Sequence, residues 1–283
     1  MKLIIGILIF VAGLVVACGP ASPIDNSTQA EPNSPVATPA TDSQIESPVP
    51  NPTPAGETGQ INWNHSPDQR IIQAIFCCGF TTRNFAMNYL AEATVWGDGR
   101  IVWVEQSPEG ARQVLEGHLT MDQLNNLFQR VVETGFFDWD ERYANEMIAD
   151  AADKCLQITI ENRSKEVCEY VEGAPPAFHD LYAEVAAGAG ATGTPYVPKR
   201  GYLTATVLPE GGDFSETVEM WPEEAAGFSL SEATGGRWVE GEALDTAWRV
   251  VNQGPFTAVE EGETYYELTL QLPDLSLTEL PLE

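Results

Sequence analysis

The sequence predicts an α+β protein in which small antiparallel sheets pack against amphipathic helices, in two subdomains behind a disordered tether. Three observations predict this fold class: three segments place apolar residues at helical spacing, β-prone runs alternate with turns, and one long stretch is proline-rich without a hydrophobic period. The predicted organisation is a lipoprotein signal peptide at 1–17, a Pro/Ser/Thr-rich tether at 18–60, an α+β domain at 61–190 and a second α+β subdomain at 196–283.

The first folded region is expected to begin with strands. Arg70–Phe76 is an apolar run of strand type. The runs Leu90–Trp96 and Arg100–Glu105 flank Gly97-Asp98-Gly99, and glycine and aspartate tolerate the positive φ of tight hairpin turns. We therefore predict a strand followed by a β-hairpin.

Two amphipathic helices are expected in the same region. Thr120 and Gln123 form a capping box, and Gly135 is a stop signal. The apolar positions between them follow helical spacing: Leu124, Leu127, Phe128, Val131 and Val132. After Pro175-Pro176 the spacing recurs at Phe178, Leu181, Tyr182 and Val185. Both stripes are interpreted as core.

A second hairpin is predicted from Lys154–Glu161 and Lys165–Val171, with its turn around Asn162-Arg163-Ser164. Cys155 and Cys168 fall on its two arms with the parity of one shared face, which favours a disulfide between them. Cys77 and Cys78 would then form a vicinal disulfide or stay reduced. The alternative joins one of these adjacent cysteines to the hairpin.

The four cysteines also allow a zinc site in principle. Adjacent cysteines lack the two-residue gap that lets both thiolates reach one tetrahedral ion. Four cysteines in an oxidising compartment favour disulfides. We therefore expect no metal and no cofactor.

The second region is expected to follow a loose connection at Gly188–Pro195. Three runs are of strand type, and one segment is helical: Tyr202–Leu208, Thr217–Trp221 and Tyr265–Leu272, with the helix at Glu242–Gln253. Its apolar positions match those of the first helix after a shift of 120 residues. An internal duplication of a helix-turn-strand unit and two unrelated α+β pieces both fit this pattern.

The amino end has the layout of an export signal. Lys2 is followed by fourteen residues, Leu3–Val16, that are apolar apart from two glycines. This run is shorter than the roughly 20 residues that span a bilayer. Val15-Val16-Ala17-Cys18 looks like a bacterial lipobox, which implies diacylglycerol on the Cys18 thiol and cleavage before it. The expected location is the extracytoplasmic face of the cell membrane, with the lipid as anchor.

The tether and the charge limit the partners. Residues 19–60 hold nine of the twenty prolines, five acids and no base, which is typical of a solvated, semi-extended spacer. The whole chain has 14 Lys and Arg against 42 Asp and Glu, a net charge of -28. Such a surface repels phosphate backbones, so no nucleic acid is expected as a partner. The expected partners are the membrane, through the Cys18 lipid, and an envelope protein or glycan.

Several motifs together resemble a known type of domain. They are Gly79-Phe80, Val95-Trp96-Gly97-Asp98-Gly99-Arg100-Ile101, the helix ending in Gly135-Phe136-Phe137, and Gly173-Ala174-Pro175. Over roughly residues 70–187 the chain is similar to an uncharacterised domain family of bacterial lipoproteins. The resemblance implies fold and location, and no activity comes with it.

The sequence shows no catalytic signature, so no catalytic residue is assigned. His65, His118 and His179 lie in different predicted elements, and no Gly-x-Ser-x-Gly is present. Weaker candidates are acids for calcium or acid/base work and tryptophans for a sugar or peptide platform: Asp138, Asp140, Glu141, Asp150 and Asp153; Glu105 with Glu109; Glu223 with Glu224; Trp221, Trp238 and Trp248.

We therefore expect a non-enzymatic binding or scaffolding module of the cell envelope. The alternatives are an extracytoplasmic hydrolase with an unrecognised carboxylate site and an inhibitor-type module. A deep pocket with two or more convergent ionisable groups of shifted pKa would favour the enzyme. A shallow apolar or aromatic groove would favour binding.

Overall fold

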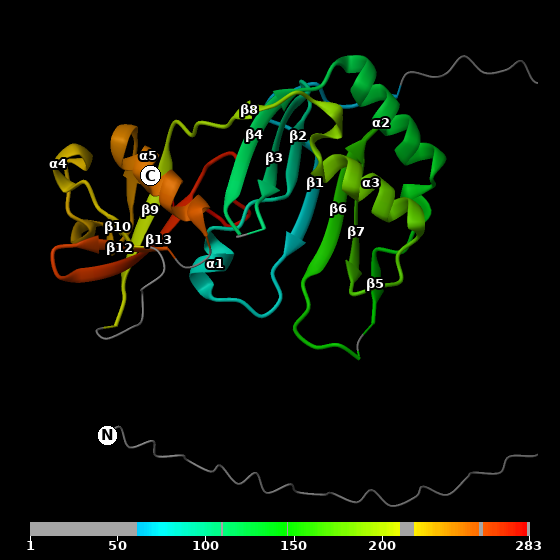
Figure 1. The fold of residues 1–283 in the computed structure, drawn as a ribbon. Helices are drawn as coiled ribbons and strands as arrows, with labels where there is room; N and C mark the ends of the chain where they lie inside the picture. Colours follow the sequence, from blue (N-terminus) through cyan, green and yellow to red (C-terminus); the bar gives the residue numbers. More distant parts are fainter. Residues whose placement is uncertain (1–60, 109, 146, 210–217, 255–256, 282–283) are drawn as a thin grey trace, which may run out of the picture. The chain divides into compact units, whose positions relative to one another are not determined.

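A computed structural model describes residues 61–281, except for 109, 146, 210–217 and 255–256. The predicted signal peptide, the lipidation site Cys18 and the tether lie outside these residues. Among the described helices, none has the length and apolarity needed to cross a lipid bilayer. The described residues belong to one compact unit, which holds two sheets and their helices (Figure 1).

The first sheet has eight strands in the order β5-β7-β6-β1-β2-β3-β4-β8. Its strands are β1 Arg70–Cys77, β2 Ala93–Trp96, β3 Arg100–Gln106, β4 Arg112–His118, β5 Arg142–Ala144, β6 Asp153–Ile160, β7 Arg163–Tyr170 and β8 Thr194–Pro195. All neighbours pair antiparallel except β5 and β7, which are parallel.

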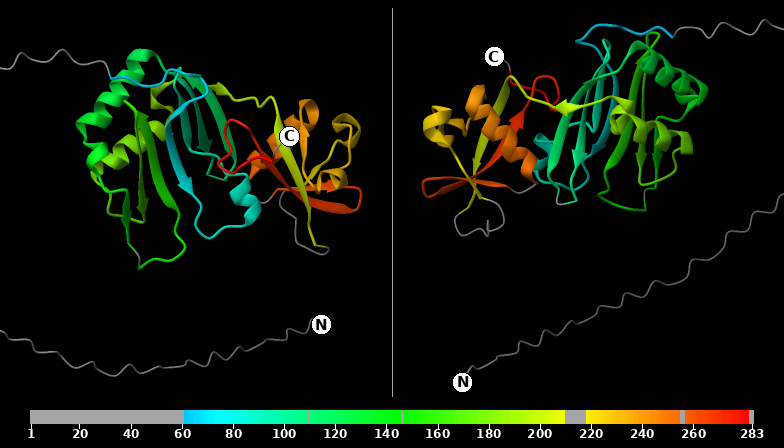
Figure 2. Two further views of the ribbon diagram at one scale, coloured as in Figure 1. Left: turned by 180° about the vertical axis from the view of Figure 1, so that it is seen from behind. Right: turned by 45° about the horizontal axis from the view of Figure 1, so that its top comes forward.

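The helices of this part are α1 Arg83–Met87, α2 Met121–Glu133 and α3 Pro176–Ala186, with 3-10 turns at Phe136–Asp138 and Gly188–Gly190. Helices α2 and α3 cover one face of the sheet (Figures 1 and 2) and are joined by an ion pair between Arg130 and Glu184. Their predicted apolar stripes are buried, with the exception of Val132, which is 45% exposed. The Thr120 capping box is also present, as predicted.

The second sheet has five strands in the order β10-β12-β13-β9-β11. Its strands are β9 Gly201–Val207, β10 Val218–Met220, β11 Arg237–Val239, β12 Ala258–Glu261 and β13 Thr264–Gln271, and its helices are α4 Glu223–Ala226 and α5 Gly241–Gln253, with a 3-10 turn at Leu230–Ala233. Here β10 and β12 are parallel. The α+β fold is thus confirmed, and each sheet also contains one parallel pair.

Strand β3 shows how the two sheets share a core. Ile101 and Trp103 point to the cluster under α2 and α3, whereas Val102 belongs to a second cluster with side chains of the second sheet and α5. Val104 packs against this second cluster. Successive side chains of a strand point to opposite faces, so a strand covered on both faces is apolar at consecutive positions.

The turn of the second hairpin lies earlier in the sequence than predicted. Its two turn residues are Glu161 and Asn162, both with positive φ, and β7 begins at Arg163. A two-residue hairpin turn with positive φ at both positions matches the twist of the strands that it joins. The turn predicted around Asn162-Arg163-Ser164 was therefore placed too late.

The prediction of a loose connection at Gly188–Pro195 is wrong, because this segment is packed into the fold. Strand β8 pairs with β4, opposite Leu115 and Glu116. A Cβ at Gly193 would overlap the ring of Trp103. The glycines at this point allow the chain to pass directly over a buried tryptophan, so the segment belongs to the packed fold.

Helices α2 and α5, whose apolar positions match after a shift of 120 residues, are followed by strands in different sheet positions. Strand β5 follows α2 and lies at the edge of the first sheet, whereas β12 follows α5 and lies between β10 and β13. The internal duplication stays a prediction.

Candidate ligand-binding site

A pocket of about 170 Å³ lies between the first sheet, the segment that follows α1, and α5. Three segments far apart in sequence form it: the stretch from α1 to the start of β2, the adjoining ends of β3 and β4, and the end of α5. Its lining residues are Phe85, Asn88, Tyr89, Leu90, Glu92, Val104, Gln106, Gly110, Arg112, Val251 and Gly254. We call this the Arg112 pocket.

The side chain of Asn88 fixes one wall of the Arg112 pocket. Its amide nitrogen donates to the carbonyl oxygen of Leu268 at 2.9 Å, and its side-chain oxygen accepts from the backbone N–H of Leu270 at 2.8 Å. Asn88 therefore pairs with β13 as a further strand residue would. This places α1 beside β13 (Figure 1).

The guanidinium of Arg112 lies at the junction of the three segments. It donates to the carbonyl oxygen of Asn88 at 2.7 Å and to that of Val251 at 2.8 Å. Burial lowers the pKa of Arg112 to about 10, and the nearby Tyr89 hydroxyl opposes this shift. Arg112 stays charged at neutral pH and forms no ion pair with a carboxylate of the described residues.

Glu92 supplies the opposite charge in the Arg112 pocket. Its carboxylate accepts a hydrogen bond of 2.9 Å from the hydroxyl of Tyr182 on α3. The backbone carbonyl oxygen of Glu92 accepts from the N–H of Val104 at 2.9 Å, which holds the residue beside β3. Glu92 is thus placed by both main-chain and side-chain bonds.

Two tyrosines next to these charges stay neutral. Burial, followed by the charge of Glu92, raises the pKa of Tyr182. Burial also raises the pKa of Tyr89, whose hydroxyl accepts from the N–H of Phe76 at 2.8 Å. The charge of Glu92 raises the pKa of Tyr89 further, and the charge of Arg112 lowers it.

The groups with shifted pKa in the Arg112 pocket are suited to hydrogen bonding and charge recognition at neutral pH. General acids and bases work best when their pKa lies near the operating pH. The shifted groups in the Arg112 pocket, Tyr89 and Arg112, keep their protons far above neutrality. They can orient a ligand by hydrogen bonds and charge.

The cysteines of the hairpin are paired. Cys155 and Cys168 lie opposite each other in the β6–β7 register, with a Cα–Cα distance of 4.1 Å, and form a disulfide. This is the pairing that the hairpin parity predicts. Cys77 and Cys78 at the end of β1 form the second, vicinal disulfide of the structure.

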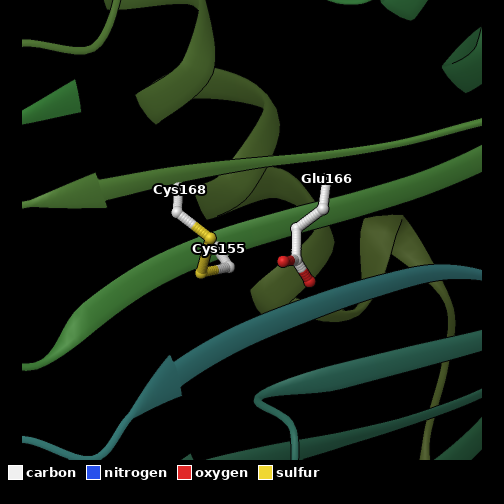
Figure 3. Close-up of side chains that lie close together, drawn as sticks. All are labelled: Cys155, Glu166 and Cys168. Atoms are coloured by element: carbon white, nitrogen blue, oxygen red, sulfur yellow. A yellow bond between two sulfur atoms is a disulfide. The ribbon is translucent and has the colours of Figure 1, made fainter. Parts of the chain in front are cut away.

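Glu166 lies close to the hairpin disulfide (Figure 3). Its carboxylate and the sulfurs of Cys155 and Cys168 lie within 4.8 Å of one another, a spacing that suits metal ligands. Sulfurs joined to each other are not thiolates, and the thiolate is the form that binds zinc. The disulfide therefore leaves Glu166 as a single exposed carboxylate.

The three histidines lie apart: His65 in the segment before β1, His118 at the end of β4 and His179 on α3. Their neighbours are the ring of Trp63 for His65, the carbonyl oxygen of Asp98 for His118, and the carboxylate of Glu169 at 3.4 Å for His179. Glu169 is almost fully buried and also accepts from the N–H of Ala174. None of the three lines the Arg112 pocket.

The acidic and aromatic candidates do not gather into one site in the described residues. Asp153 pairs with Arg142, Glu105 accepts from Trp103, and Glu109 lies outside the described residues. Glu223 and Glu224 form the first turn of α4. Trp221 is buried against Phe228, Trp238 lies under Arg200, and Trp248 packs on Tyr196.

Sequence reasoning missed Arg112, Glu92 and Tyr89 as site residues. They follow no motif, since the pocket joins distant segments: Arg112, for example, bonds the carbonyl oxygen of Val251, 139 positions away along the chain. The one available signal is the scarcity of basic residues. In a chain with 14 Lys and Arg against 42 Asp and Glu, each basic residue is a candidate for a specific role.

A comparison with family models identifies part of the chain. Residues 90–187 match a family described as a domain of unknown function (DUF6438). No curated protein and no solved structure matches the chain. The match includes Glu92, Val104 and Arg112 but stops before the second sheet, so the Arg112 pocket is only partly made by the matched domain. The chain therefore carries, at residues 90–187, a domain of this uncharacterised family.

Proposed function

We propose that this protein is a membrane-anchored extracytoplasmic lipoprotein whose folded part is a binding module of the cell envelope. The lipobox at Val15–Cys18 supports the anchor, and the proline-rich segment 19–60 supports a spacer between lipid and fold. The observation that carries the binding function is the Arg112 pocket. It combines apolar walls with a few convergent polar groups, which is the usual composition of a small-molecule site.

An extracytoplasmic hydrolase is the alternative to consider, because the pocket does contain ionisable groups with shifted pKa. The direction of the shifts favours binding. Tyr89 is held neutral and Arg112 is held charged at neutral pH, so neither exchanges a proton there. A pocket of this kind recognises charge and shape.

The anchor is tested by expressing the full chain in a bacterial host with a lipid label. Wild-type protein should incorporate labelled fatty acid and stay with the membrane fraction, and Cys18→Ser should do neither. A labelled Cys18→Ser protein, or an unlabelled wild-type protein, would contradict the lipidation at Cys18.

The binding function is tested on the Cys18→Ser chain, mixed with an envelope extract and analysed by native mass spectrometry. Val104→Phe places a larger side chain in the Arg112 pocket and should abolish the captured small-molecule adduct. Val132→Phe, at an exposed position of α2, is the matched control and should keep it. An adduct that survives Val104→Phe, or no adduct at all, would refute binding in this pocket.

A further inference from the structure

We propose that the Arg112 pocket binds a small zwitterion with an apolar body, an aliphatic α-amino acid in its chemistry. The carboxylate of this ligand lies at Arg112 and its ammonium group at Glu92. The proposal rests on the proposed binding function and names the ligand class of that site.

The positive end has unused hydrogen-bonding capacity. A guanidinium has five N–H donors in a planar fork that matches a carboxylate. Arg112 uses two of them on the carbonyl oxygens of Asn88 and Val251. These neutral partners orient the side chain and leave its charge without an acidic counterpart in the described residues.

The negative end is arranged in the same way. Glu92 accepts from the Tyr182 hydroxyl, a neutral donor. In the described part of the chain it forms no ion pair with a lysine, an arginine or a histidine. A carboxylate in a partly buried pocket gains from a cation in hydrogen-bond contact, and a ligand ammonium supplies that cation.

The two charges are held apart and do not neutralise each other. Glu92 and Arg112 both line the pocket, yet no ion pair joins them among the described residues. The pocket is therefore neutral as a whole but has a positive and a negative end. Its electrostatic complement is a ligand with both charges and no net charge.

The charges of the chain and of the pocket disfavour the simpler ligand classes. A net charge of -28 makes the approach of a free carboxylate less favourable, and a plain amine would leave the guanidinium without its anion. A zwitterion experiences neither penalty. The charges that line the pocket and the net charge of the chain thus both favour a zwitterionic ligand.

The walls define the size and the character of the ligand body. Phe85, Leu90, Val104 and Val251 contribute apolar surface around a volume of about 170 Å³. A cavity of ~150 Å³ holds a benzene molecule, so this space suits a ligand of about six to ten non-hydrogen atoms. Leucine is of this size.

The test is calorimetric titration of the Cys18→Ser chain with three matched compounds. They are L-leucine, isocaproate, which lacks the amino group, and isopentylamine, which lacks the carboxylate. We expect leucine to bind and each analogue to bind roughly 10-fold more weakly or worse, since loss of one charged partner leaves its counterpart unpaired in the pocket. Valine and phenylalanine extend the series in size.

Glu92→Gln is the decisive variant, because it leaves the Arg112 contacts in place and retains an acceptor for Tyr182. It should weaken leucine binding about 10-fold or more and reduce the difference between the affinities for leucine and isocaproate. Glu105→Gln on β3, a carboxylate that does not line the pocket, is the control and should change neither the leucine affinity nor its ratio to the isocaproate affinity. A variant of Arg112 would be less informative, because it would also lose the contacts with the carbonyl oxygens of Asn88 and Val251.

The outcomes separate this proposal from the proposed function. If isocaproate or isopentylamine binds wild-type protein as tightly as leucine, or if none of the amino acids binds, the zwitterion assignment is wrong. The binding function then still stands on the adduct removed by Val104→Phe. Absence of that adduct overturns the function itself.

Discussion

The guanidinium of Arg112 donates a hydrogen bond of 2.8 Å to the backbone carbonyl oxygen of Val251, near the end of α5. This bond joins β4 of the first sheet to the helix that covers the second sheet. The same guanidinium bonds the carbonyl oxygen of Asn88, whose side chain is paired with β13. One side chain thus links three segments of the fold.

Arg112→Lys is expected to lower the free energy of unfolding by about 1–3 kcal/mol, because an ammonium cannot reach both carbonyl oxygens in the geometry of the guanidinium. Urea denaturation measures this change. Arg83→Lys, at an exposed position of α1, is the matched control and should stay within about 0.5 kcal/mol of wild type. Equal urea midpoints for Arg112→Lys and Arg83→Lys would show that Arg112 does not join the sheets.

Removal of the hairpin disulfide is expected to destabilise the fold by about 2–3 kcal/mol. Cys155 and Cys168 are 13 positions apart, and cross-linking a loop of this length restricts the unfolded chain. The double variant Cys155→Ser, Cys168→Ser tests this by denaturation without reductant. Cys77→Ser, Cys78→Ser should change stability by less than about 1 kcal/mol, since adjacent residues enclose almost no loop. The reverse order of the two losses would refute this account.

Tyr196 is expected to make the fold sensitive to alkali. Burial, followed by the charge of Asp274, raises the pKa of Tyr196 to about 12 from an ordinary value of about 10. Between these values the unfolded chain loses the proton and the folded chain keeps it. The stabilisation is therefore complete below pH 10 and is lost as the pH rises to about 12.

Tyr196→Phe should reduce this alkaline loss of stability, which is measured by denaturation at a series of pH values. The loss will not vanish, because the pKa values of Tyr89 and Tyr182 are raised as well. Phenolate absorbance follows the ionisation itself. A pH dependence identical to that of wild type would assign the alkaline transition to other groups.

Gly193→Ala is expected to cost about 1–3 kcal/mol of folding free energy, because the added methyl group would overlap the ring of Trp103 in a filled core. Thermal unfolding of the variant measures the loss. Gly235→Ala is the control, since its added carbon meets no atom within 4 Å. If both variants unfold at the same temperature, β8 does not press on Trp103.

The parts of the fold that the sequence determined are the local ones. The hairpin around Gly97-Asp98-Gly99 and helix α2 from its Thr120 cap were predicted closely, because their signals lie within a few residues of each other. The Cys155–Cys168 pairing also follows from the register of one hairpin. Short-range conformational preferences and side-chain periodicity are sufficient for such elements.

Strand β4 shows what only the tertiary structure decided. Arg112–His118 has no clear hydrophobic alternation, and it becomes a strand because β3, covered on both faces, presents a free edge to pair with. The Arg112 pocket arises in the same way, from Asn88, Arg112 and Val251 brought together by sheet packing. Such contacts depend on the three-dimensional path of the backbone between them, and no local pattern of residues records that path.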